Sequence, residues 1–382
     1  MGRRMGLLLL GWFGGSLTAP LSAQQAQPAA LQAVSSVDGS GVPMEAMAPP
    51  GTFALGQAHA EALDVVRGEL DRLLEREGAA RQSASARSAV ALAALALLRT
   101  GTGGSSLEDD RRVARLVAAW LQDAPGGSPS GAARAEADEL LVVAALLERR
   151  GSSAGLSAIE LSALGAQRIA ALTALLTADG GWAAAGPQAD TELTAHGVAA
   201  LSAARRAGLP VPDALLERAL AGLQRARLGV QLVTPGLWPL DAVDGDPAAG
   251  PLLPASSVTR VQAVHGALGQ AGEAVAADDV LAGLDAFQRH HRVLDLALRH
   301  KDGGSSVHGL HAEQYLSAHL SAAELLPQLS RAERSRFRGR LALDVLATRR
   351  SDGAYVDGSH GGHGRLVGTA RAALTLRALL DA

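Results

Sequence analysis

Apolar residues recur along most of the chain at the three- and four-residue spacing of an amphipathic α-helix, beginning near residue 55. Glycine-rich and proline-containing stretches interrupt this pattern and divide it into twelve segments. We expect twelve helices that pair into six hairpins, over 55–76 with 83–99, 107–122 with 135–150, 160–177 with 190–207, 212–227 with 256–271, 277–299 with 311–327, and 331–349 with 365–381. The apolar content is mostly Ala, Leu and Val, which favours closely packed helices over sheets and predicts an all-α fold.

Short loop sequences repeat between these segments. Asp-Gly turns occur in ADGGW at 178–182, KDGGSS at 301–306 and SDGAYV at 351–356, each after the first helix of a pair, and PGLW at 235–238 is a weaker relative. Glycine after aspartate supplies the backbone freedom that a tight helix exit needs. Recurrence at this spacing is typical of stacked helical units that bury their faces against their neighbours.

Two stretches carry a family resemblance. DGGW at 179–182, followed by DTELTAHGVAALSAARRAGLPVP at 190–212, resembles the repeat of bacterial squalene-cyclase-like and prenyltransferase-repeat proteins, and DGAYVDGSHGGHGRLVGTARAALTL at 352–376 resembles their last repeat. The likeness extends over roughly residues 80–382. It implies an α/α toroid, an (α/α)6 barrel in which the first helices of the hairpins form an outer ring around an inner ring of second helices.

The N-terminus predicts export. Residues 1–23 have two arginines, an apolar run and small residues ending in Leu-Ser-Ala, as in a cleavable signal peptide. Residues 24–54 are rich in Gln, Ala, Pro, Ser and Gly and predict a flexible leader before a toroid domain at 55–382. We expect a periplasmic or extracellular protein that is not an integral membrane protein.

Charge and cysteine content exclude some classes of function. The chain has 35 basic and 38 acidic residues, so nucleic acid is an unsuitable partner. It has no cysteine, which rules out disulfides and leaves burial to hold the fold together.

The long loops and the starts of the inner helices should meet at one face of the toroid, which we call the mouth. Glu192 and His196 lie four residues apart on one helical face there, and they are the weak candidates for catalytic residues. The candidate binding residues at the mouth are Trp182, Asp190, Trp238, His265, His311, Tyr315, His319, Tyr355 and His363. Asp190 also suits the N-cap of its helix. The insertion at 228–255, which contains Trp238, is either a lid or a semi-rigid surface loop.

Ten of the eleven histidines follow residue 195, and several lie in the last two inner segments. His308, His311 and His319, with His360 and His363, could supply transition-metal ligands or line a polar cavity. The spacing lacks a specific metal motif, and we expect no metal and no cofactor.

Four functions were weighed against the residues. A class II terpene cyclase needs a D-x-D-D-T acid motif, but in Asp190-Thr191-Glu192-Leu193 a leucine occupies the last acidic position. A protein prenyltransferase needs a cysteine ligand for zinc, which the chain lacks.

The two remaining functions differ in kind. A glycan hydrolase or lyase would need carboxylates facing one another across the mouth, for which the candidates are Glu192, Glu313, Asp138 and Glu139. A non-catalytic binding or scaffolding toroid, with a lipid or isoprenoid-like ligand or a protein partner at its mouth, agrees with the scarcity of aromatic residues. We favour the last, and keep as the alternative a divergent terpene cyclase or glycan-active enzyme that uses Glu192 with His196 and His311 with His363.

Overall fold

The computed structural model describes residues 50–77, 83–99, 107–122, 132–149, 156–183, 189–230, 254–299, 314–355 and 363–382. Within these ranges the chain is helical, and only two isolated β-bridges occur. The helices are α1 (Thr52–Glu77), α2 (Ala84–Leu98), α3 (Leu107–Gln122), α4 (Ala132–Glu148), α5 (Ala158–Ala174), α6 (Thr191–Arg206), α7 (Asp213–Val230), α8 (Pro254–Gln270), α9 (Ala277–Arg299), α10 (Gln314–Leu325), the 3-10 turn η3 (Leu326–Gln328), α11 (Arg331–Leu346) and α12 (Gly364–Asp381).

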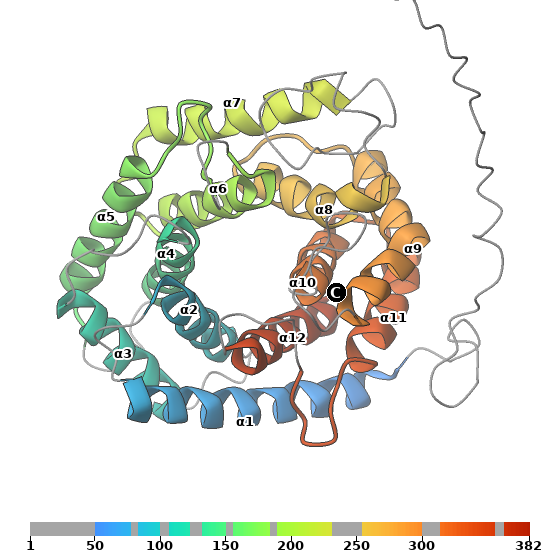
Figure 1. Ribbon diagram of the computed structural model, residues 1–382, viewed down its shortest axis with the longest axis horizontal. Helices are drawn as coiled ribbons and strands as arrows, with labels where there is room; N and C mark the ends of the chain where they lie inside the picture. The colour runs from blue at the N-terminus through green and yellow to red at the C-terminus, as the bar shows by residue number, and fades with distance from the viewer. Residues whose placement is uncertain are drawn as a thin grey trace, which may run out of the picture. The chain divides into compact units, whose positions relative to one another are not determined.

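The helices of the compact unit Ala48–Ala382 form two concentric rings (Figure 1). In the inner ring α2 contacts α4, α4 contacts α6, and the contacts continue through α8, α10 and α12 back to α2. The odd-numbered helices surround this ring (Figure 1). The expected all-α, (α/α)6 toroid is therefore confirmed.

The outer helices bind the ring together by bridging successive hairpins. Although each outer helix precedes its inner partner in the sequence, α1 packs chiefly on α12, α5 on α4, and α9 on α8. The first and last helices of the toroid are thus in direct contact, which closes the ring without a disulfide.

Burial differs between the two rings because the inner helices have neighbours on more sides. From Ser88 to Leu98 every residue of α2 is buried, and this stretch is almost entirely alanine, valine and leucine. Small side chains let helices approach closely on several faces. The outer helix α3 instead exposes charged side chains, among them Glu108, Arg111 and Arg115.

Glycine turns connect outer to inner helices in two equivalent places. Gly180 and Gly353 have φ angles of 82° and 79°, a left-handed conformation in which a side chain would be strained. Two residues later, Trp182 and Tyr355 each donate a backbone N–H to a threonine hydroxyl of the following inner helix, at 3.1 Å in both cases. The repeated Asp-Gly sequences therefore produce the same local structure.

Helix bounds agree with the sequence pattern to within about three residues at nearly every end. α11 begins at its expected position, where Ser330 and Glu333 form a reciprocal capping box. The last turn expected of α10 is instead the 3-10 turn η3, in which proline follows Leu326. Most of the insertion at 228–255, with Trp238, lies outside the described residues. Among the helices that are described, none is both long and apolar enough to span a bilayer.

Candidate functional site

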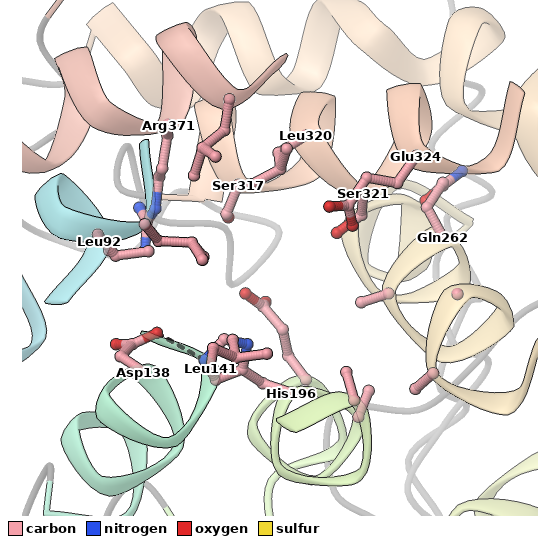
Figure 2. A pocket seen from close by; sticks show the side chains of 18 of the residues that line it. Leu92, Asp138, Leu141, His196, Gln262, Ser317, Leu320, Ser321, Glu324 and Arg371 are labelled. Atoms are coloured by element: carbon pink, nitrogen blue, oxygen red, sulfur yellow. Dashed lines mark hydrogen bonds and ion pairs between the residues drawn. The ribbon is translucent and has the colours of Figure 1, made fainter. Parts of the chain in front are cut away.

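A cavity lies at the axis of the toroid and is lined by all of the inner helices (Figure 2). Asp138 of α4 and His196 of α6 lie together on one wall, and Ser317, Ser321 and Arg371 extend from α10 and α12 on the opposite wall (Figure 2). Its volume is about 120 Å³, smaller than the roughly 300–1,000 Å³ of a typical small-molecule site. The cavity therefore suits one end of a chain-like ligand.

An acidic and a basic side chain form a dyad on the wall between α4 and α6. His196 Nε2 lies 2.7 Å from Asp138 Oδ1, and Ser88 of α2 donates its hydroxyl to Asp138 Oδ2 at 2.5 Å. The carboxylate is buried, whereas 23% of the His196 side chain remains exposed. Burial raises the pKa of Asp138, but the charge and hydrogen bond of His196 outweigh it, and the pKa is lowered overall.

The lowered pKa keeps Asp138 ionised at neutral pH, so the carboxylate can orient the imidazole and stabilise its protonated form. Because Asp138 occupies Nε2, the Nδ1 atom of His196 is the nitrogen that can exchange a proton with a ligand. This arrangement provides an oriented acid or base on the cavity wall.

A second carboxylate lies one helical turn away, at the mouth of the cavity. Glu192 is the second residue of α6 and shares a helical face with His196. Gln314 of α10 donates to Glu192 Oε2 at 3.2 Å, and Arg134 Nη2 of α4 lies 3.8 Å from Glu192 Oε1. Since α6 and α10 are not neighbours in the ring, the Gln314 bond crosses the mouth and holds Glu192 toward the cavity.

The opposite end of the cavity is crossed by an ion pair. Arg99, which caps the C-terminus of α2, lies 2.9 Å from Glu324 near the end of α10. These helices are separated in the ring by α12. Between the two ends the walls are largely apolar, with Leu92, Leu141 and Leu374 among the lining residues. The site is thus a narrow pocket that is polar at its mouth, apolar in its middle and bridged at its far end.

All these helices begin at the mouth and end at the far side. Residues of the first turn of α4, α6 and α10 meet around Glu192, whereas the last residues of α2 and α10 meet at the Arg99–Glu324 pair. The N-termini of these helices carry partial positive charge. Arg134 adds positive charge at the mouth beside the carboxylate of Glu192, and Arg371, about two turns into α12, adds positive charge deeper in the cavity.

Of the expected site residues that the structure describes, Asp138, Glu192 and His196 line this cavity. Trp182 and Tyr355 are fully buried in the core, and the Trp182 indole donates to the Leu172 carbonyl at 2.8 Å. They differ from expectation because they fill the space between inner and outer helices, where the Asp-Gly turn places them.

Asp190 is the N-cap of α6, as its position in the sequence suggested, and accepts a hydrogen bond from the Leu193 amide at 2.7 Å. Burial, followed by the charge of Glu192, raises its pKa. Its role is therefore to begin the helix that carries Glu192 and His196.

The predicted histidines do not gather at the mouth. His265 of α8 is buried close to Gly283 of α9, and Tyr315 and His319 of α10 are buried facing α9 and α11. His363 precedes α12 and is not among the lining residues. Trp238 and His311, with His308, His360 and Glu313, lie outside the described residues.

The remaining candidate carboxylate, Glu139, points away from the cavity. It is buried in an ion-pair network with Arg87 of α2 and Arg168 of α5. Asp138, the residue before it, faces the cavity. Consecutive residues of a helix point in different directions, so Glu139 belongs to the ion-pair network while Asp138, one position earlier, faces the cavity.

Several lining residues were not anticipated from the sequence. They are Arg99, Arg134, Ser317, Ser321, Glu324 and Arg371. A helical periodicity was available as a signal, because Arg134, Asp138 and Leu141 are spaced i, i+4 and i+7, as are Ser317, Ser321 and Glu324. Such spacing identifies one face of a helix. Which face points to the axis of the toroid depends on how the inner helices pack against their neighbours.

No protein-family model matches the chain, and a search of curated proteins gives no significant match. Solved structures do share its fold. A possible member of the GH105 family from Klebsiella pneumoniae subsp. pneumoniae MGH 78578 aligns with a TM-score of 0.52 and 15% identity, over 84% of this chain and 93% of that one.

Two further structures align with lower scores. A polysaccharide lyase has a TM-score of 0.49 and 11% identity, over 85% of this chain and 97% of that one. A glycosyl hydrolase family 88 protein from Bacteroides vulgatus has a TM-score of 0.46 and 12% identity, over 85% and 98%.

The likeness to the possible GH105 member corrects two expectations. The resemblance to squalene-cyclase-like proteins is wrong, because the structure that shares this toroid has a different family name. The DGGW-type turns that suggested it are explained by hairpin geometry, which needs a left-handed glycine and a buried aromatic ring. The same structure contradicts the preference for a protein without enzymatic activity, because it is named as a possible member of an enzyme family.

Proposed function

We propose that this protein is a glycan-active enzyme that cleaves glycosidic bonds at the mouth of its central cavity. One observation carries the proposal: Glu192 and His196 face the cavity one helical turn apart, and Asp138 holds the imidazole at 2.7 Å. Cleavage of a glycosidic bond requires a proton donor for the leaving oxygen and a second group on the other side of the bond. The two side chains supply both functions.

In the proposed reaction the imidazolium of His196 donates its Nδ1 proton to the glycosidic oxygen as the bond from that oxygen to the sugar carbon breaks. Glu192 takes a proton from a water molecule, whose oxygen forms the new bond to carbon. Asp138 remains ionised and stabilises the charged imidazole throughout. Ser88 stabilises Asp138 in turn through its hydroxyl hydrogen bond.

The residues that line the cavity also favour a particular substrate and product. Because the Arg99–Glu324 pair bridges the far end and the cavity is small, one terminal sugar fits better than the middle of a chain. Arg134, Arg371 and the helix N-termini favour a sugar that bears a carboxylate. We therefore propose removal of terminal residues from acidic oligosaccharides.

Carbocation chemistry fits the same walls poorly. None of the described lining residues is Phe, Tyr or Trp, and a cationic polyene intermediate needs aromatic faces around it. A lipid-like ligand or a protein partner at the mouth stays a prediction. Export, as the N-terminal sequence predicts, would bring the enzyme to extracellular polysaccharide, and cell fractionation with an antibody to the chain tests it.

The proposal is tested by incubating the purified protein with a panel of acidic and neutral oligosaccharides and analysing the products by mass spectrometry. Hydrolysis adds the mass of water across the cleaved bond, whereas elimination leaves an unsaturated sugar. We expect monosaccharide release from acidic substrates, and a fall in kcat of about 10²–10⁴ for His196→Gln. His290→Gln on α9 is the matched control, and equal activity of the two variants would disprove the assigned site.

A further inference from the structure

A second group of titratable side chains lies outside the central cavity, where α9, α10 and α11 meet. His291 of α9, His319 of α10 and Asp344 of α11 are 3%, 0% and 1% exposed. A ligand atom from each of the three lies within 4.8 Å of the other two. The proposed glycan chemistry uses none of these residues.

The hydrogen-bond partners of the two imidazoles determine which nitrogens face the centre of this group. His319 Nδ1 lies 2.7 Å from the Tyr315 carbonyl oxygen, which can only accept, so Nδ1 carries the proton and Nε2 has a lone pair. The two Nε2 atoms lie 3.0 Å apart, so His291 Nε2 is the donor in the hydrogen bond between them. An Asp295 carboxylate oxygen lies 3.4 Å from His291 Nδ1 and would receive the proton if it moved to that nitrogen.

We propose that His291, His319 and Asp344 bind a divalent transition-metal ion, with zinc as the best fit, and that this ion fastens the outer helices α9 and α11 to the inner helix α10. Two imidazoles and one carboxylate are ligands that zinc accepts. A cation between the two Nε2 atoms would replace the hydrogen bond between them with two coordinate bonds.

The distances suit such an ion. Ligand atoms about 2.0–2.1 Å from zinc in a tetrahedral site are roughly 3.3 Å from each other. The two Nε2 atoms are 3.0 Å apart, and His291 Nε2 is 3.5 Å from Asp344 Oδ2. Small side-chain adjustments would therefore bring three protein ligands to the ion, and a water molecule would take the fourth position of a tetrahedral site.

The surroundings resemble the outer shell of a metal site. Metal-binding histidines commonly donate their second ring N–H to a carbonyl or a carboxylate. The Tyr315 carbonyl has this position for His319, and an Asp295 carboxylate oxygen lies 3.4 Å from His291 Nδ1. Arg340 donates a hydrogen bond to Asp344 Oδ2 at 3.3 Å, and His291 Nε2 lies 3.5 Å from the same oxygen. Phe287 packs edge-on against both imidazoles, with ring centroids at 5.7 and 5.1 Å. This packing leaves a closed site, as a structural ion requires.

A competing arrangement has no metal. In it His291 donates its Nε2 proton to the lone pair of His319 Nε2 at 3.0 Å, and no ion lies between the two rings. The same experiments decide between the two.

The full-length protein, purified without a histidine tag and stripped with a chelator, is titrated with Zn²⁺ and with Co²⁺. We expect about one equivalent of zinc to remain after dialysis, and visible absorption bands of four-coordinate cobalt. His291→Gln and His319→Gln should lose both, and Asp344→Asn should weaken binding about 10–100-fold. His290→Gln, the residue before His291, is the matched control and should bind as the wild type does.

Because these variants remove buried groups, circular dichroism must confirm that they fold. X-ray absorption of the zinc-loaded wild type gives an independent result, with two imidazole ligands expected. Absence of stoichiometric zinc from the wild type, or equal binding by a folded His319→Gln variant, would overturn the proposal. Either result would support a direct hydrogen bond between His291 and His319 without an ion.

Discussion

At the scale of single residues, the site depends on a buried charge that the fold keeps ionised. Asp138 is 2% exposed, and an isolated carboxylate at such a position would be costly. His196 and Ser88 compensate by bonding to separate carboxylate oxygens. The carboxylate in turn fixes the orientation of the one imidazole that faces the cavity. Each group needs the other, so changing either should affect chemistry more than binding.

Replacing Asp138 by asparagine tests this dependence. The amide keeps the shape but cannot stabilise a protonated His196, so kcat on the best substrate of the panel should fall at least about 10²-fold, with a much smaller change in KM. Steady-state kinetics measures both. Asp213→Asn, which removes a carboxylate that is 81% exposed on α7, should leave them unchanged. An Asp138→Asn variant with wild-type kcat would contradict a role for Asp138 in the reaction.

The lowered pKa of Asp138 also predicts a pH dependence of stability. Its pKa in the folded state is below the roughly 3.9 of an unfolded chain, so the folded state binds fewer protons between the two values. The resulting stabilisation is fully present above about pH 4 and is lost as pH falls through the folded pKa. The difference in unfolding free energy between wild type and Asp138→Asn should therefore shrink as the pH falls below about 4. Urea titrations at several pH values measure it, and a difference that grows in acid would contradict the sign.

The sequence predicted part of this site. Glu192 and His196 follow from their i, i+4 spacing near the start of a helix. Asp138 was expected only as a carboxylate across the mouth from Glu192. Its pairing with His196 depends on how α4 and α6 are rotated about their axes, which the spacing along either helix does not specify.

At the scale of helices, the turn between α5 and α6 relies on close contact with an aromatic ring. A side chain added at Gly197 of α6 would lie 2.5 Å from the Trp182 ring, which is fully buried. Gly197→Ala should therefore lower the free energy of unfolding by about 1–3 kcal/mol, although alanine is the better helix former. Chemical denaturation measures the change. Gly56→Ala in α1, where no atom lies within 4 Å of the new side chain, should be neutral or stabilising.

A network of buried ion pairs joins α2, α4 and α5. Arg168 is 2% exposed at its side chain and contacts Glu136 at 3.1 Å and Glu139 at 2.8 Å. Arg168→Ala would leave buried carboxylates short of a partner and should cost about 3–5 kcal/mol in unfolding free energy. Arg205→Ala, whose pair with Asp213 is exposed, should cost less than about 1 kcal/mol. Similar losses for both variants would show that burial of the Arg168 network is unimportant.

The existence and order of the helices were predictable because each combines an apolar period with clear breakers. What the pattern did not predict is the packing between them. Leu161 and Leu164 of α5 belong to one apolar face, but only the ring determines that this helix packs more on α4 than on its hairpin partner α6.

At the scale of the whole molecule, the closed inner ring produces the site. Parallel inner helices place their N-termini at one mouth, where residues from α4, α6 and α10 converge on Glu192. The toroid was predicted correctly, but the family was not. The turns and small residues that suggested squalene-cyclase-like proteins are requirements of stacked helical hairpins, and unrelated sequences meet them in the same way.

Glycan cleavage in this cavity is tested most directly by a crystal structure of the Glu192→Gln variant with an acidic oligosaccharide that the wild type cleaves. We expect a terminal sugar inside the cavity, with its glycosidic oxygen within hydrogen-bonding distance of His196 and its carboxylate near Arg134 or Arg371. An oligosaccharide bound at any other surface, with the cavity empty, would contradict it.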